Sequence, residues 1–163
     1  GGGFFSKIPA LTIGAVVMRL RRLEELRISL TSAQRDRFDK AKQSHEAVYR
    51  EWKTHYEKKL LREAHSRLDA MRTFFEECEN DPRLCAQVYS PEVLRRTIVQ
   101  EIMLYMKNID LTDETLTTKI TGVDGRLRRY VRPNDFFWDK TLETAYPQAD
   151  FWWLYQRPVG KER

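Results

Sequence analysis

The chain has 163 residues, of which 41% are hydrophobic and 33% are charged, and its formal net charge at pH 7 is +5. This length allows one domain or one long helical element with appendages, and the composition excludes an intrinsically disordered chain. The positive charge favours an anionic neighbour such as anionic lipid, nucleic acid or an acidic partner subunit.

The distribution of glycine predicts a mainly α fold. No glycine occurs between Gly14 and Gly122, and the prolines within that interval are Pro82 and Pro91. Sheets need turns and turns use glycine, so such an interval favours helices. We predict a short N-terminal helix, a long antiparallel helical hairpin and an irregular, aromatic-rich C-terminal extension. The corresponding segments are 1–30, 31–108 and 109–163.

The N-terminal segment predicts a helix over residues 11–28, although its apolar run TIGAVVM is also compatible with a buried strand. The uncharged stretch between residues 7 and 19 is shorter than the roughly 20 residues that cross a membrane. Two interpretations follow. We favour a buried first helix, and the alternative is an interfacial helix whose Arg19, Arg21 and Arg22 contact anionic headgroups.

The longest predicted helix begins at Thr31, which forms a capping box with Gln34. Its apolar residues recur every eleven positions at Phe38, Tyr49, Leu60 and Met71. A period of eleven predicts a nearly straight helix rather than a left-handed supercoil. If unbroken as far as Cys78, this helix would be roughly 70 Å long at about 1.5 Å per residue.

The three histidines all lie on this helix and do not predict a metal site. His45, His55 and His65 are ten residues apart, or about 15 Å of helical rise per step, which exceeds the reach of one shared metal. The sequence His45-Glu46 begins like a zinc-protease motif, but the position of its second histidine is Tyr49. We therefore predict no metal and no cofactor.

A further helix is predicted from Ser90, as N-cap, and Pro91, at the first helical position, and it should fold back on the long helix. The connection contains CENDPRLC, with the only two cysteines at Cys78 and Cys85. Two free thiols are the favoured interpretation. The alternative is a disulfide, which would imply an oxidising compartment. Beyond it, the segment 109–129 predicts either a short hairpin at its VDGR turn or a helix that ends at Gly122.

Almost half of the aromatic residues fall between residues 130 and 155. These rings either fold back onto the helices or enter pockets on a partner, where Trp, Tyr and Arg dominate the binding energy. We predict partner binding by Phe136, Phe137, Trp138, Tyr146, Phe151, Trp152, Trp153, Tyr155 and Arg157.

A basic patch is interleaved with these rings and consists of Arg126, Arg128, Arg129 and Arg132. Arginine next to stacking rings also binds single-stranded RNA. No RNA-binding module is recognisable, however, and the acidic residues of the same segment would repel phosphate. Protein partners are therefore favoured over nucleic acid.

The stretch LETAYPQ at 142–148, the aromatic residues after it and the pair Arg157-Pro158 resemble the C-terminal segment of subunit d of the mitochondrial ATP synthase peripheral stalk. In that family an acidic residue follows the proline, whereas this chain has Gln148. The similarity is confined to the tail. It implies a non-catalytic, mostly helical stalk subunit that ties other subunits together.

The sequence contains no phosphate-binding loop, dinucleotide fingerprint, nucleophile elbow or CxxC motif, so an enzyme is not predicted. The predicted function is a structural subunit of a larger assembly, which we expect to be a membrane-associated energy-converting complex of mitochondria such as ATP synthase or a respiratory complex. Its partners would be other protein subunits, with anionic lipid at the N-terminal segment under the interfacial interpretation. The alternative is an RNA-contacting structural protein of a mitochondrial ribosome-like particle.

Overall fold

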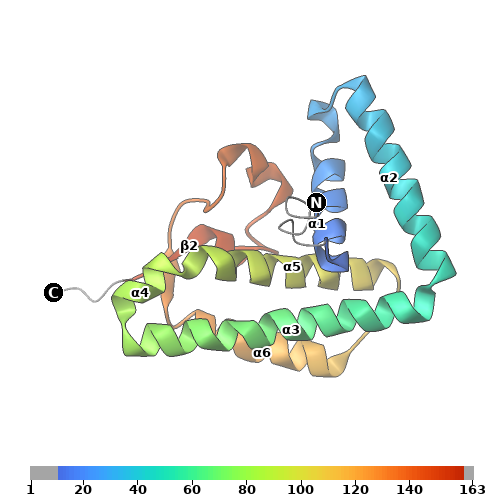
Figure 1. The fold of residues 1–163 in the computed structure, drawn as a ribbon. Helices are drawn as coiled ribbons and strands as arrows, with labels where there is room; N and C mark the ends of the chain where they lie inside the picture. Colours follow the sequence, from blue (N-terminus) through green and yellow to red (C-terminus); the bar gives the residue numbers. More distant parts are fainter. Residues whose placement is uncertain (1–10, 160–163) are drawn as a thin grey trace, which may run out of the picture.

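The computed structural model describes residues 11–159, and it confirms a mainly α fold with an irregular aromatic C-terminal segment (Figure 1). The helices are α1 (Ile13–Glu25), α2 (Ser32–Glu51), α3 (Lys53–Asn80), α4 (Pro82–Gln87), α5 (Tyr89–Asn108) and α6 (Glu114–Leu127). The 3-10 turns are η2 (Arg27–Ser29), η3 (Lys140–Ala145) and η4 (Trp152–Tyr155), and the strands are β1 (Val131–Pro133) and β2 (Gln156–Pro158).

The body of the protein is an antiparallel pair of helices, α3 and α5, which lie side by side in Figure 1. Helix α5 is the central element, because α1, α3 and the C-terminal segment all pack against it. It is buried on several sides, and its buried residues are Tyr89, Glu92, Val93, Arg96, Thr97, Ile98, Val99, Glu101, Ile102 and Met106. Residues from all three predicted segments contribute to one hydrophobic core.

Helix α5 begins at Tyr89, two residues earlier than predicted, so Ser90 is not its N-cap. The N-cap is Val88, which makes no side-chain capping bond. The predicted combination of a polar cap and proline at the first position is found instead at the preceding short helix α4. There the Asp81 side chain accepts a hydrogen bond from Arg83 N, and Pro82 opens the helix.

The prediction of one unbroken helix from Thr31 to Cys78 is wrong. The capping box at Thr31 is present, but the helix breaks at Trp52 (φ −115°, ψ 29°), and Figure 1 shows α2 standing at a steep angle to α3. Neither glycine nor proline causes the break. It allows Tyr49 of α2 to contact both Tyr56 and Tyr105 edge-on, with ring centroids 5.3 and 6.0 Å apart. A straight helix would separate Tyr49 from α5.

Of the two alternatives for the segment 109–129, the helix forms and the hairpin at VDGR does not, although the helix does not end at Gly122. Asp113 caps it by accepting a hydrogen bond from Leu116 N, and the helix continues through Gly122 and Gly125. A Cβ at either glycine would meet open space, which places both on the outer side of α6. The inner side is tied to the core by Arg96, whose Nε and Nη2 donate to the two carboxylate oxygens of Asp124 at 2.7 and 2.9 Å.

Helix α1 forms over the run that could also have been a strand, and its N-terminus is held by Glu63 of α3. Thr12 Oγ1 and Gly14 N both donate to the Glu63 carboxylate, at 2.8 and 2.9 Å. Arg67 donates to the same carboxylate at 2.9 Å. A Cβ at Gly14 would clash with Glu63 Oε2 and lie 2.7 Å from Ile98 Cγ2, so glycine permits this close approach of α1 to both α3 and α5.

Cys78 and Cys85 are joined by a disulfide, whereas free thiols were the favoured interpretation of the sequence. The bond closes the corner where α3 turns into α4, and both residues are 2% exposed within the core. The short helix α4, which contains Cys85, brings this cysteine back over the end of α3, and the helix was not part of the prediction. Disulfides persist in oxidising compartments.

Candidate functional site

The most buried of the predicted docking residues are core residues. Tyr146, Phe151 and Trp153 are at most 1% exposed. The Trp153 indole N–H donates to Thr97 Oγ1 at 2.9 Å, and its carbonyl accepts a hydrogen bond from Tyr89 at 2.7 Å. These three rings are therefore not a free docking surface, because burying them on α5 already removes their apolar area from water.

The remaining predicted docking residues are half-buried and pack against the same core; they are Phe136, Phe137, Trp138, Trp152, Tyr155 and Arg157. Strands β1 and β2 pair antiparallel and return the chain end to the start of the segment, with Val131 opposite Pro158. Arg157 lies over the Phe137 ring at 4.3 Å. The C-terminal segment is thus a folded part of the protein that packs against the helices.

The predicted basic patch lies on the surface, where Arg126 is half-buried and the other three arginines are exposed. Arg126 lies 4.8 Å from the centroid of the Phe75 ring, and Arg128 lies 3.8 Å from that of the Trp152 ring. Both guanidinium groups are engaged by rings of the same chain. Arg129 and Arg132 are exposed, as is Arg128, and two of the four guanidinium groups of this surface patch lie over rings of the same chain.

The N-terminal arginines also differ from the interfacial interpretation. Arg21 pairs with the buried carboxylate of Glu101, and Arg22 donates to the Tyr146 hydroxyl at 2.9 Å. Only Arg19 is exposed. Residues 8–10 of the uncharged stretch lie outside the described residues, and none of the described helices is long and apolar enough to span a membrane. Two of the three arginines therefore anchor α1 to the protein.

The junction of α2 and α3 presents the largest exposed aromatic side chain. Trp52 is 57% exposed and Val48, one turn before it in α2, is 50% exposed. A shallow hollow beside them is lined by Arg50, Glu51, Trp52, Lys53, Thr54 and His55. We call Val48, Trp52 and these neighbours the elbow. It combines exposed apolar area with a net positive rim.

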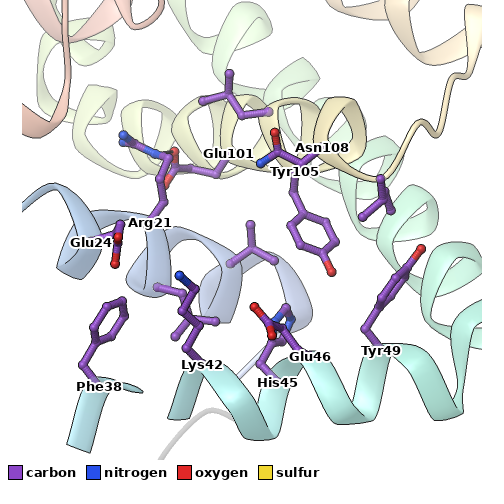
Figure 2. Close-up of a pocket in the computed structure, with 14 residues that line it drawn as sticks. Arg21, Glu24, Phe38, Lys42, His45, Glu46, Tyr49, Glu101, Tyr105 and Asn108 are labelled. Atoms are coloured by element: carbon purple, nitrogen blue, oxygen red, sulfur yellow. Dashed lines mark hydrogen bonds and ion pairs between the residues drawn. The ribbon is translucent and has the colours of Figure 1, made fainter. Parts of the chain in front are cut away.

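A groove of about 400 Å³ lies between α1 and α2, and α5 forms its floor (Figure 2). Its apolar lining residues are Val17, Leu20, Phe38, Leu104 and Ile109. Its polar and aromatic lining residues are Arg21, Glu24, Lys42, His45, Glu46, Tyr49, Glu101, Tyr105 and Asn108. The groove remains open beneath α2 because this helix is attached to the rest of the protein mainly near its two ends.

The attachments of α2 are specific. Near its start, Asp39 accepts two hydrogen bonds from Arg27 at 2.9 and 3.1 Å. Near its end, Tyr49 donates to Glu57 at 2.9 Å, and His45 Nε2 shares a hydrogen bond of 2.5 Å with the Tyr56 hydroxyl. Burial lowers the pKa of His45, so its imidazole is neutral at pH 7. It acts here as a structural partner of a tyrosine.

Glu101 is the unusual residue of the groove. It is 0% exposed, and one of its oxygens accepts from Arg21. Its other oxygen, Oε2, has no hydrogen-bond partner among residues 11–159. Burial raises the pKa of Glu101 to about 7, although the nearby Arg21 opposes this rise. A buried oxygen without a donor carries a cost of about 1–3 kcal/mol or more.

The described part of the chain holds no group of three or more His, Cys, Asp or Glu side chains arranged to bind a metal ion. His45 lies in the groove, His55 lines the hollow of the elbow and His65 lies elsewhere on α3. The structure does not bring the three histidines together.

Neither Trp52 nor Glu101 was identified from the sequence. A signal for Glu101 was present, because it lies in the run TIVQEIMLYM, where apolar residues occur on all sides of the helix. A helix of that kind is buried, and a charge within it needs a partner. No comparable signal marks Trp52, whose exposure depends on a break that contains no helix-breaking residue.

Comparison of the chain with protein-family models, with curated proteins and with solved structures finds no match.

Proposed function

We propose that this chain is a non-catalytic interaction subunit of a larger assembly and that the elbow is its docking element. The observation that carries the proposal is the exposure of Trp52 together with Val48 on one face of the chain. Tryptophan is the residue most enriched among binding hot spots, which bury it in a pocket of the partner. The other tryptophans of the chain pack against its own core.

The architecture around the elbow supports a docking role. Helix α2 stands away from the body (Figure 1), and Phe38 is its only residue that is fully buried. The helix is nevertheless fixed at both ends, so the elbow is held in one place without being covered. A rigid, exposed aromatic side chain loses little conformational entropy on binding.

The partner that fits the elbow is a protein surface with an apolar pocket and an acidic rim. The rim of the elbow carries Arg50 and Lys53 against Glu51, so its charge is complementary to carboxylates. Such complementarity chiefly speeds association, whereas the buried indole would supply most of the affinity.

The setting that we propose is a membrane-associated energy-converting complex of mitochondria, and this part of the proposal depends only on the resemblance of the tail to stalk subunit d. The segment concerned forms η3, after which the chain turns at Pro147. The RNA-binding alternative has less support, because Arg126 and Arg128 lie over rings of the same chain.

The test compares the native size of the chain in mild-detergent extracts of its own cells with that of a Val48→Ser/Trp52→Ser variant. We expect the wild-type chain to migrate in an assembly and the variant to migrate alone, with an unchanged thermal unfolding midpoint. The matched control is Leu94→Ser, which removes an apolar side chain that is 41% exposed on α5 and should leave assembly intact. An assembled elbow variant, or a wild-type chain that is always monomeric, would contradict the proposal.

A further inference from the structure

The groove between α1, α2 and α5 has the properties of a ligand-binding site. This site is separate from the elbow. Its volume of about 400 Å³ lies within the usual range for small-molecule sites, which are mostly apolar with a few convergent polar groups. Both conditions are met, since aliphatic and aromatic side chains form most of its wall and a single buried carboxylate forms part of its floor (Figure 2).

The charges of the lining define the sign of the ligand. The groove contains three carboxylates, Glu24, Glu46 and Glu101, against the two cations Arg21 and Lys42. With Glu101 ionised and His45 neutral, the lining residues sum to a formal charge of −1. Glu24 also pairs with Arg27 outside the lining, so the excess carboxylates are Glu46 and Glu101, and they favour a monovalent cation over an anion.

The hydrogen bonds of Glu101 indicate which chemical group of the ligand would contact it. Oε2 is buried and accepts no hydrogen bond from any described residue, whereas the other oxygen is occupied by Arg21. A ligand N–H in contact with Oε2 would supply the missing donor, and a charged donor forms the shorter and stronger type of hydrogen bond.

We infer that this groove binds a small amphipathic cation, a primary ammonium or guanidinium group on an apolar chain, with its head on Glu101 and its chain along the apolar wall. The chain would lie against Val17, Leu20 and Leu104 and pass the rings of Phe38 and Tyr105, which line the same space. Tyrosine and phenylalanine rings also attract a cation through their π faces.

A second buried glutamate offers a matched control. Glu92 is 6% exposed, and its Oε2 also has no hydrogen-bond partner among the described residues. It pairs with Arg95 and does not line the groove. The two residues share burial and an unpartnered oxygen and differ in their access to the groove.

The first experiment is a calorimetric titration of the full-length chain at pH 8 with n-octylammonium, 1-octanol and octanoate. The three probes share one apolar chain and differ in the charge of the head. We expect octylammonium to bind at least about tenfold more tightly than octanol or octanoate. Glu101→Gln should abolish this preference, and Glu92→Gln should retain it. Equal binding of octylammonium and octanol, no binding of octylammonium, or equal losses in the two variants would overturn the inference.

The second experiment does not depend on the folding of a variant. In methyl-labelled protein, octylammonium should shift the resonances of Val17, Leu20 and Leu104, which line the groove, and leave that of Val93, which does not. Leu20→Phe, at the half-buried edge of the groove, should weaken binding by at least about fivefold because it narrows the space for the chain. Shifts at Val93 alone, or none in the groove, would contradict the proposed location.

Binding should also release protons near pH 7. Burial raises the pKa of Glu101 to about 7, and an adjacent cationic head would lower it, because an opposite charge favours the ionised carboxylate. The binding enthalpy should therefore depend on the ionisation enthalpy of the buffer at pH 7 and lose that dependence in Glu101→Gln. The charged and titratable groups around Glu101 are Arg21, Arg22, Glu24 and Glu25 of α1, Lys42, His45 and Glu46 of α2, Tyr105 of α5 and Tyr146 after η3. A wild-type enthalpy that is independent of buffer would contradict contact between the head and Glu101.

Discussion

Replacing Trp153 by Ala should remove a large part of the free energy of unfolding, although the sequence alone suggested that this residue binds a partner. Truncating a buried aromatic side chain costs about 3–5 kcal/mol. Trp153 is 1% exposed, and its loss would also deprive the fully buried Thr97 Oγ1 of its donor at 2.9 Å, which adds about 1 kcal/mol. We therefore expect a decrease of about 4–6 kcal/mol in the free energy of unfolding, from a total that is typically about 5–15 kcal/mol for a domain.

The assay is urea unfolding followed by far-UV circular dichroism, because tryptophan fluorescence would change with the substitution itself. The control is Trp52→Ala, which removes an indole that is 57% exposed and should change stability by no more than about 0.5 kcal/mol. The two variants separate a core ring from a docking ring. If Trp153→Ala costs less than about 2 kcal/mol, or no more than Trp52→Ala, the C-terminal segment is not part of the core and the account of its rings is wrong.

Three further predictions concern the disulfide, the buried acids and the first helix. Replacing Cys78 and Cys85 together by Ser should lower the free energy of unfolding by about 2 kcal/mol, the value for a loop of this length; a reductant should destabilise the wild-type chain similarly and the variant not at all. Burial raises the pKa of both Glu92 and Glu101 from 4.5 to about 7, so the folded state binds more protons than the unfolded state between these values, and stability should fall as pH rises through that window and level off above it. The urea midpoint at pH 5 should therefore exceed that at pH 8, and replacing both glutamates by Gln should reduce the difference; a midpoint that rises with pH would contradict the burial of these carboxyls. Gly14→Ala should cost about 1–3 kcal/mol, measured by urea unfolding, because the added methyl group overpacks the contacts of α1 with Glu63 and Ile98; a neutral effect would show that these contacts are looser than described.

The parts of the fold that the sequence predicted are those set by local interactions. The capping box of Thr31 and Gln34 forms because its partners are three residues apart and need no tertiary contact. The turn back from α3 to α5 follows from the position of Pro82 and from apolar stripes on both helices. Local rules also favoured a helix at α1, since a buried strand would have needed a sheet to join.

The parts that were mispredicted depend on contacts between distant residues. The break at Trp52 is stabilised by Tyr49 reaching Tyr105, which is remote in sequence and invisible to any periodicity in α2 and α3. The burial of Trp153 depends on α5 offering Thr97 as an acceptor. An aromatic, irregular segment has the same composition whether its rings cover their own helices or a partner, so composition could not decide between the two.

The groove was beyond sequence reasoning for a related reason. Glu101 and Arg21 meet because α1 packs across α5, and no spacing along the chain predicts that crossing. Each residue viewed alone is compatible with an ordinary charged position on a helix. Only their pairing leaves one carboxylate oxygen buried without a donor among the described residues.

The central claim, that the elbow docks the chain to a protein partner, is tested most directly by photo-crosslinking in the native assembly. A benzoylphenylalanine in place of Trp52, which is 57% exposed, should form a cross-link of one defined mass with a partner subunit. The same group in place of Leu94, which is 41% exposed, should form none. Cross-links from position 94 and not from position 52, or none from either while the chain remains assembled, would contradict the claim.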